Sequence, residues 1–247
     1  MIELHFHCLP GIDDGPGDWD EAVALCRAAA DEGTETIVAT PHVLRDPWLN
    51  EDQKARDGQI AKLNSLLDGR PAILPGSEYW FGSDMLALLE RGSVGPMTTL
   101  NRGRYLLVEF PPGDVPSLAN AAFHELGLMG ITPVVAHPER NQAFARNPAR
   151  LGELVERGAV VQVTAASLLG ELGLRVQQAA LELFEAGMLH LVSSDAHSLS
   201  ARPPRLAAAR EWVRRSWGDE VEGALFDLNP RAVLSSQPLP YMGPGSR

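Results

Sequence analysis

The stretch Ile2-Glu3-Leu4-His5-Phe6-His7 opens the chain as a short apolar run that ends in two histidines. It is too short for a typical helix and predicts a strand with apolar side chains on both faces, as in a parallel sheet that is covered by helices. Because side chains alternate along a strand, His5 and His7 are expected to project from the same side.

Similar runs recur along the chain and alternate with longer amphipathic stretches. The six further runs are Thr36–Thr40, Ala72–Gly76, Tyr105–Glu109, Thr132–Ala136, Ala159–Val163 and Leu189–Ser193. This alternation predicts an α/β fold with right-handed crossovers, and a length of 247 residues suits either one (β/α) barrel or two small domains. No linker, composition break or repeat divides the chain, so we expect a single domain over residues 1–236. Residues 237–247 are rich in Pro, Gly and Ser and predict a loose tail.

Helix boundary signals lie between the predicted strands. Asp18, followed by Glu21 three residues later, predicts a capping box that begins a helix, and Gly33 is placed to end it. Signals of the same kind predict two more helices, over Asn147–Gly158 and from about Leu174 to Gly187.

The composition excludes several classes of protein. With 32 acidic and 21 basic residues the formal charge is −11, which argues against binding nucleic acid or an anionic membrane surface. No apolar stretch approaches the ~18 residues of a membrane span, and the segment Met1–His5 lacks a signal-peptide pattern. We therefore expect no membrane insertion and a cytoplasmic location.

The two cysteines, Cys8 and Cys26, are too few for a disulfide scaffold. A cysteine-dependent phosphatase needs an arginine six residues after its nucleophile, and those positions hold Asp14 and Glu32. The nucleotide-binding patterns GxxxxGK[ST] and GxGxxG and the hydrolase pattern GxSxG are also absent from the sequence. A thiol or serine nucleophile is therefore not expected.

Histidines and carboxylates end or follow six of the seven predicted strands, where the strands of a barrel converge. A single such histidine is more often an ordinary core residue, and an Asp-Gly pair alone is an ordinary turn, but so many costly groups together indicate a metal site. The candidate ligands are His5, His7, Asp14, His42, Glu78, Glu109, His137, Asp195 and His197. We expect ordinary structural roles for the two remaining histidines, His124 and His190.

The donor types restrict the kind of metal. Imidazole and carboxylate ligands without a cysteine pair suit Mn²⁺, Fe²⁺ or Zn²⁺ in an open catalytic site. Nine candidate ligands exceed the needs of one ion, which takes about four to six. The sequence therefore predicts two or three ions, with at least one carboxylate bridging them.

The ordered set of candidate ligands resembles the PHP (polymerase and histidinol phosphatase) superfamily. Longer strings resemble its bacterial tyrosine-protein phosphatases, which are encoded with capsule and exopolysaccharide genes, over residues 1 to about 233. These strings are HCLPGIDDGP (His7–Pro16), VATPH (Val38–His42), LVEF (Leu107–Phe110), GITPVVAHPERN (Gly130–Asn141) and SSDAHSLSARPP (Ser193–Pro204).

The resemblance implies a distorted, TIM-like (β/α)7 barrel with a trinuclear centre, most often of Mn²⁺, with Fe²⁺, Zn²⁺ or Mg²⁺ as alternatives. It implies that Glu78 bridges the first two ions and that Arg140 and Arg202 bind phosphate as catalytic residues. The implied ligands are His5, His7, Glu78 and Asp195 for the first ion, Glu78, Glu109 and His137 for the second, and Asp14, His42 and His197 for the third.

The implied activity is hydrolysis of phosphotyrosine by a metal-activated hydroxide, on a bacterial tyrosine kinase that regulates capsular or exopolysaccharide synthesis. A small-molecule phosphatase, for example for histidinol phosphate, and a metal-holding module without activity are the alternatives. Residues 44–59 match the family poorly, which leaves the substrate rim open. Trp48, Trp80 and Phe81 could line a phenyl pocket, although packing is the more ordinary role for such side chains. No general acid and no oligomeric state can be assigned.

Overall fold

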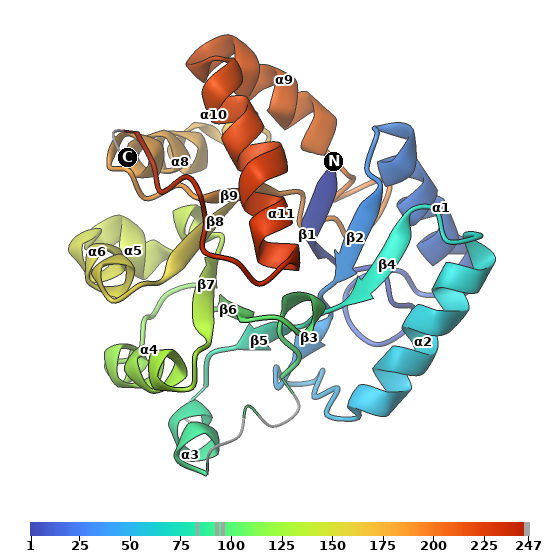
Figure 1. The fold of residues 1–247 in the computed structure, drawn as a ribbon, viewed down its shortest axis with the longest axis horizontal. Helices are drawn as coiled ribbons and strands as arrows, with labels where there is room; N and C mark the ends of the chain where they lie inside the picture. Colours follow the sequence, from blue (N-terminus) through green and yellow to red (C-terminus); the bar gives the residue numbers. More distant parts are fainter. Residues whose placement is uncertain (83, 92–93, 95–96, 245–247) are drawn as a thin grey trace.

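Parallel strands form the centre of the fold in a computed structural model that describes residues 1–247 except 83, 92–93, 95–96 and 245–247 (Figure 1). One sheet has the order β1 (Ile2–Phe6), β2 (Thr36–Ala39) and β4 (Ala72–Pro75). The other has the order β3 (His42–Val43), β5 (Glu78–Trp80), β6 (Tyr105–Glu109), β7 (Thr132–Ala136), β8 (Val160–Thr164) and β9 (Leu191–Ser193). All of their pairings are parallel, which confirms the predicted α/β class.

Two of the seven strand positions contain a second short strand beyond the predicted run, β3 after Thr36–Thr40 and β5 after Ala72–Gly76. The chain passes from β2 into β3 through Pro41, which has no N–H to donate to a neighbouring strand. It passes from β4 into β5 through Gly76, where a Cβ atom would lie 2.6 Å from Cγ1 of Val38. Only glycine fits so close to the neighbouring strand.

Hydrogen bonds between β1 and the segment after β9 join the two ends of the strand series. The N–H of Asp195 donates to the carbonyl of His5 (3.0 Å), and the N–H of His7 donates to the carbonyl of Ala196 (2.9 Å). The seven strand positions therefore follow one another around a ring, as a distorted (β/α)7 barrel requires.

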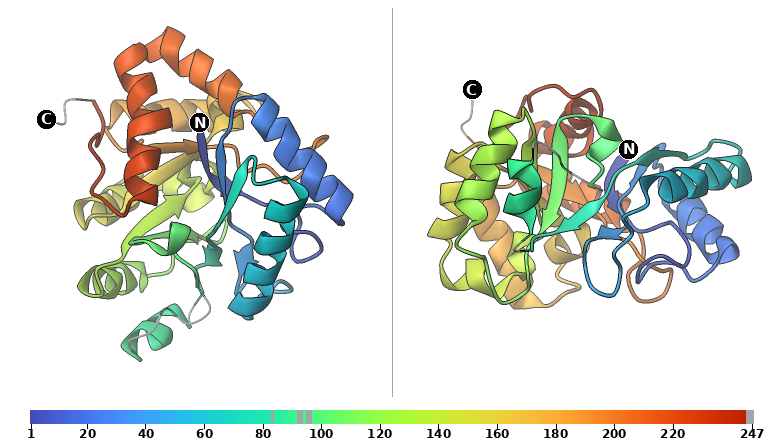
Figure 2. Two further views of the ribbon diagram at one scale, coloured as in Figure 1. Left: turned by 45° about the vertical axis from the view of Figure 1, so that its right-hand side comes forward. Right: turned by 90° about the horizontal axis from the view of Figure 1, so that it is seen from below.

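Helices surround the strands (Figures 1 and 2). Along the chain they are α1 (Trp19–Asp31), α2 (Gln53–Leu66), α3 (Met85–Glu90), η1 (Leu100–Arg102), α4 (Ala119–Leu128), η2 (Pro138–Arg140), α5 (Gln142–Arg146), α6 (Ala149–Glu156), α7 (Ala165–Leu168), α8 (Leu174–Glu185), α9 (Leu206–Trp217), α10 (Asp219–Gly223), η3 (Ala224–Leu228) and α11 (Asn229–Leu234). None of the helices that the structure describes is both long and apolar enough to cross a membrane.

Apolar side chains fill the ring near the amino ends of its strands. Leu4, Val38, Leu107 and Val134 pack there in one buried cluster with Val233 of α11. Helix α11 lies at this end, where the side chain of Asn229 donates a hydrogen bond to the carbonyl of His190 just before β9 (2.8 Å). The opposite end of the ring, at the carboxyl ends of the strands, holds the polar side chains described below.

The cap of α1 differs in one detail from the predicted capping box. The side chain of Asp18 accepts hydrogen bonds from the N–H groups of Asp20 (3.0 Å) and Glu21 (2.9 Å), as predicted. The carboxylate of Glu21 accepts from the N–H of Gly17 (2.8 Å) and not from that of Asp18. The reciprocal half of the box is therefore displaced by one residue towards the loop.

The ends of the other two predicted helices agree closely with the structure. Helix α6 begins one residue later than expected, with Pro148 in the N-cap position, and α8 begins at Leu174. Gly158 and Gly187 follow the C-caps of α6 and α8 with φ angles of 94° and 70°. Glycine adopts this left-handed conformation without the steric penalty of a Cβ atom.

The segment after α11 is attached to the domain at two points. The hydroxyl of Tyr105 donates to the carbonyl of Gln237 (2.6 Å). The backbone of Tyr241 forms two hydrogen bonds with the Asn229 side chain, of 2.8 and 3.1 Å. Residues 245–247 of the expected loose tail lie outside the described residues, and both the tail and a domain boundary at residue 236 stay predictions.

Candidate metal centre

All nine predicted ligands lie together at the carboxyl ends of the strands. They form four groups in which the potential ligand atoms lie within 4.8 Å of one another. The groups are His7, Asp14, His42 and His197; His5, His137 and Asp195; His5, His7 and Glu78; and His42, Glu78 and Glu109. Each of the nine residues belongs to at least one group, and every group contains three or four of them.

Glu78 on β5 lies at the centre of these groups, with its side chain only 1% exposed. Its Oε1 atom lies 3.3 Å from Nε2 of His5 and 3.1 Å from Nε2 of His137. Its Oε2 atom lies 3.3 Å from Nε2 of His7 and 2.9 Å from Nδ1 of His42. Each carboxylate oxygen therefore faces two imidazoles, an arrangement suited to a bridging ligand.

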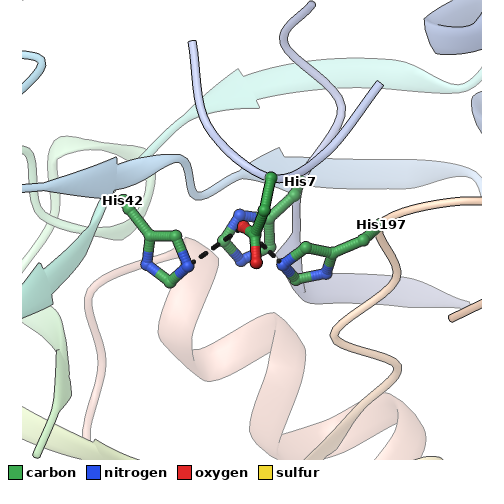
Figure 3. Close-up of side chains that lie close together, drawn as sticks. His7, His42 and His197 are labelled. Atoms are coloured by element: carbon green, nitrogen blue, oxygen red, sulfur yellow. Dashed lines mark ion pairs between the residues drawn. The ribbon is translucent and has the colours of Figure 1, made fainter. Parts of the chain in front are cut away.

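A second focus of the cluster is the carboxylate of Asp14, in the loop after β1. Its Oδ1 atom lies 3.3 Å from Nε2 of His42 and 3.2 Å from Nε2 of His197. Figure 3 shows that the rings of His7, His42 and His197 point toward one another, with dashed lines marking these ion pairs. The rings of His7 and His197 stack with centroids 3.7 Å apart.

Hydrogen bonds hold two of the imidazoles in one orientation. Nδ1 of His5 lies 2.9 Å from the amide oxygen of Gln162, and Nδ1 of His7 lies 2.8 Å from a carboxylate oxygen of Asp13. Since both partners are acceptors, each Nδ1 carries the proton. In the neutral rings each Nε2 then presents a lone pair, and the two Nε2 atoms are only 3.3 Å apart. Two lone pairs this close can ligate the same cation.

His197 is oriented in the same way, and several buried ligand atoms form no hydrogen bond. Its Nδ1 lies 2.9 Å from the backbone carbonyl of Asp195, which leaves Nε2 free to ligate. Oε2 of Glu78, Oδ1 of Asp195 and Nε2 of His197 are buried and form no hydrogen bond, and their near neighbours are other candidate ligands. Because buried polar atoms without hydrogen bonds are costly, these residues fit a group of bound divalent cations.

The carboxylates make the cluster strongly attractive to positive charge. Burial opposes protonation of His5, but the charges of Glu78 and Asp195 outweigh it and raise its pKa to about 9. Burial likewise opposes protonation of His42, yet Glu78 and its other acidic neighbours raise its pKa to about 10. Burial and the neighbouring His7 lower the pKa of His197 to about 4, so that its ring is neutral at pH 7.

Both predicted phosphate-binding arginines reach the mouth of the cluster. Nη1 of Arg140 donates to Oδ2 of Asp195 (2.6 Å), and Nη2 of Arg202 donates to the same oxygen. Arg202 also lies 3.7 Å from Asp14. About a third of each guanidinium side chain is exposed, and a guanidinium has five N–H donors, so both can contact an incoming anion as well.

Three residues near the centre escaped the sequence prediction. Asp13 and Gln162 contact ligand imidazoles, and Gln162 is the one polar residue of the run Ala159–Val163, which is a usable signal. Asp13 stands next to Asp14 in an ordinary turn sequence, Asp13-Asp14-Gly15, so the sequence gives no sign that both carboxylates act at the site. Arg45 lies in the stretch with poor family resemblance, where no pattern points to it.

Arg45 lies beside the cluster between two aromatic rings. Its Nη1 atom is 2.6 Å from Nε2 of His42 and donates to Oε2 of Glu109 (3.1 Å). Its guanidinium carbon lies 4.8 Å from the ring centroid of Trp80 and 5.5 Å from that of Trp48. Both tryptophans, which were candidates for a phenyl pocket, therefore lie close to the candidate ligands.

Phe81 and the two remaining histidines lie outside the candidate metal groups. Phe81 is buried and contacts Phe110 and Phe123, so a place in a phenyl pocket is wrong for this residue. His190 is buried, and its Nδ1 accepts a hydrogen bond from the N–H of Val161 (3.0 Å), whereas His124 is exposed on α4. Neither histidine belongs to a candidate metal group.

Comparison with known proteins shows the family to which this chain belongs. Residues 1–235 match the family model described as "Capsular polysaccharide synthesis, CpsB/CapC". The chain is 36% identical over 239 residues to the tyrosine-protein phosphatase YwqE of Bacillus subtilis, covering 96% of this chain and 92% of YwqE. It is also 36% identical over 241 residues to a putative tyrosine-protein phosphatase, CapC, of Staphylococcus aureus, with the same coverage.

A crystal structure gives the same result for the whole fold. It belongs to work on YwqE from Bacillus subtilis and CpsB from Streptococcus pneumoniae, described there as "unique metal-dependent tyrosine phosphatases". It matches with a TM-score of 0.90 and 35% identity, covering 100% of both chains. This chain is therefore a member of the CpsB/CapC family, the PHP-type family associated with capsular polysaccharide synthesis.

Proposed function

We propose that this protein is a metal-dependent protein-tyrosine phosphatase. The observation that carries the proposal is the meeting of Nε2 of His5 and Nε2 of His7, 3.3 Å apart, beside the buried carboxylate of Glu78. The names of the relatives, which are tyrosine-protein phosphatases, support the substrate class. The substrate would be a phosphotyrosine protein, namely a bacterial tyrosine kinase that regulates capsular or exopolysaccharide synthesis.

The nine side chains would hold two or three divalent ions, with Mn²⁺ the first choice for this donor set. Glu78 would bridge two ions, since each of its oxygens faces two imidazoles. The sets would be His5, His7, Glu78 and Asp195; Glu78, Glu109 and His137; and Asp14, His42 and His197. Bound ions of this kind lower the pKa of a water molecule to about 7 and so supply a nucleophile near neutral pH.

The two mouth arginines would bind the phosphate. Arg140 and Arg202 converge on one oxygen of Asp195, so a phosphate placed beside them meets two planar guanidinium forks. A fork matches two phosphate oxygens at once and stabilises the negative charge that these oxygens carry during the displacement. Both arginines would thus bind the substrate and orient its ester bond toward the cluster.

An aryl ester suits this site better than an alkyl ester. A phenol has a pKa of about 10, so its phenolate leaves with less help from a general acid. Trp48 and Trp80 offer aromatic faces close to His42 and Arg45, against which a phenyl ring can pack. These features favour phosphotyrosine over histidinol phosphate, which is an alkyl ester.

The test compares both substrates after the protein has been stripped of metal with a chelator. We expect no turnover in the stripped protein, and restoration by Mn²⁺ of phosphotyrosine-peptide hydrolysis with a kcat/KM well above that for histidinol phosphate. Faster turnover of histidinol phosphate would identify a small-molecule phosphatase. Full activity without metal, or none with any divalent ion, would contradict the proposal.

A further inference from the structure

A second feature lies on the outer side of the ring, next to the candidate phosphate site. A groove of about 890 Å³ separates η2, α5 and α6 from α8. Figures 1 and 2 show α8 beside α5 and α6. The volume of the groove falls in the range of ligand-binding cavities, about 300–1,000 Å³. None of the nine candidate metal ligands lines it.

Arg140 connects this groove to the metal centre. It lines the groove and also donates to Asp195 within the cluster (2.6 Å). A molecule whose phosphate is bound by Arg140 can therefore continue directly into the groove. For a phosphotyrosine protein, that continuation is the peptide segment beside the phosphotyrosine.

The charged groups of the groove favour an acidic occupant. Arg146 and Arg175 are exposed along it; Arg175 forms no ion pair with any described residue, and Arg146 donates only to Gln142 (3.0 Å). Of the two carboxylates in the lining, Glu139 is buried and accepts from Ser167 (2.7 Å). On a chain with a formal charge of −11, this cluster of arginines stands out.

The groove also contains one exposed carboxylate, Glu182, and a base of apolar side chains. Glu182 accepts a hydrogen bond from Gln178 (3.2 Å) at the exposed edge. The floor is formed by the buried side chains of Phe144, Leu151 and Leu183. The groove thus combines cationic edges with an apolar base, a combination that binds acidic peptides containing an apolar side chain.

We propose that this groove binds the substrate segment flanking the phosphotyrosine and selects acidic segments through Arg146 and Arg175. The inference rests on the proposed phosphatase function, because Arg140 must hold the phosphate for the segment to enter the groove. It adds a docking surface outside the metal centre and predicts that peptide and small aryl phosphates respond differently to the same substitution.

The test uses the Mn²⁺-loaded full chain and three substrates: a phosphotyrosine peptide with acidic flanks, the same peptide with neutral flanks, and p-nitrophenyl phosphate. We expect wild-type protein to have a lower KM for the acidic peptide. In the double variant Arg146→Gln/Arg175→Gln, that KM should rise about tenfold, with kcat and the turnover of p-nitrophenyl phosphate unchanged. Arg231→Gln, an exposed position on α11 at the other end of the ring, is the matched control.

Equal KM values for the two peptides in wild type, or an unchanged KM in the double variant, would overturn the proposal. Loss of p-nitrophenyl phosphate turnover together with peptide turnover would also overturn it, since the defect would then lie in the centre. A change in sedimentation without a change in peptide KM would show instead that the groove joins two copies of the chain.

A binding measurement separates this proposal from the proposed function. If no phosphate ester is hydrolysed with any divalent ion, the phosphatase function fails. Fluorescence anisotropy with a fluorescent phosphonate analogue of the acidic peptide still reports on the groove. Binding by wild type that is weakened about tenfold in the double variant would support the docking surface, and equal binding by both would contradict it.

Discussion

One carboxylate oxygen of Asp13 contacts two parts of the candidate metal centre. Oδ2 of Asp13 lies 2.8 Å from Nδ1 of His7 and accepts a hydrogen bond from the backbone N–H of His42 (3.2 Å). Its other oxygen accepts from the N–H of Gly15 (2.9 Å), next to Asp14 in the chain. Asp13 therefore positions three of the four residues of one ligand group, His7, Asp14 and His42, without joining that group itself.

Replacing Asp13 with asparagine should weaken metal binding. The amide keeps the size of the carboxylate but removes the charge that fixes the His7 tautomer, and outer partners of this kind contribute about 10–100-fold to metal affinity. Isothermal titration with Mn²⁺ should show a loss of about tenfold or more for at least one ion. Asp20→Asn, at an exposed position in the first turn of α1, should bind like wild type. Equal affinity of Asp13→Asn and wild type would remove the positioning role.

Replacing Arg140 with alanine should impair phosphate binding and turnover without loss of metal. Removing one donor that stabilises the charge of a transition state typically costs about 10²–10³ in rate. We expect kcat/KM for p-nitrophenyl phosphate to fall by about 10², with unchanged metal content by elemental analysis. Arg202→Ala should behave in the same way. An unchanged rate would show that the residue does not contact the phosphate.

The affinity for metal should rise with pH, and metal binding should release protons. The neighbouring carboxylates raise the pKa values of His5 and His42 to about 9 and about 10, so protons compete with divalent ions for both imidazoles. Divalent ions must displace these protons, and turnover should fall below about pH 6 as protons compete more strongly. Mn²⁺ titrations at pH 6, 7 and 8 should give rising affinity with measurable proton release. A flat affinity, or a flat activity profile down to about pH 5, would contradict this expectation.

The buried His190 should make the protein less stable in acid. Burial lowers its pKa to about 4 from 6.5, so the unfolded chain binds the proton more readily than the folded chain. Its contribution is fully present above pH 6.5 and is lost as the pH falls toward 4, by about 3 kcal/mol for a shift of this size. His190→Asn keeps an acceptor for the N–H of Val161 and should show a shallower loss of unfolding free energy between pH 6.5 and 4.

The exposed His124 supplies the control for that experiment. His124→Asn makes the same substitution at an exposed position of α4 and should follow wild type. Urea denaturation of the three proteins at pH 7, 5.5 and 4.5 measures the difference. A wild-type profile as shallow as that of His190→Asn would show that His190 does not titrate as described.

Much of the fold follows from the sequence because buried parallel strands have a distinctive pattern. The runs Tyr105–Glu109 and Thr132–Ala136 coincide with β6 and β7, and Ile2–His7 contains β1. The short strands β3 and β5 were missed, since two or three residues are too few to show a pattern. Their pairing, with His42 opposite Glu78, forms only through the surrounding sheet.

The candidate ligands could be found because a buried charged group at a strand end contrasts with its apolar neighbours. The residues that position them carry weaker signals. Gln162 is polar within an apolar strand, but only the structure shows that its amide oxygen lies 2.9 Å from Nδ1 of His5. Arg45 reaches His42 and Glu109 through a loop conformation that no local pattern specifies. Such long-range contacts depend on the tertiary fold.

Anomalous diffraction from crystals grown with Mn²⁺ would examine the cluster most directly, because it locates each ion and identifies the element. Two or three manganese peaks should appear among the nine side chains, with one of them within coordination distance of both His5 and His7 and with Glu78 shared between two. Saturated crystals without manganese peaks at this end of the ring would contradict the metal centre and the hydrolysis derived from it.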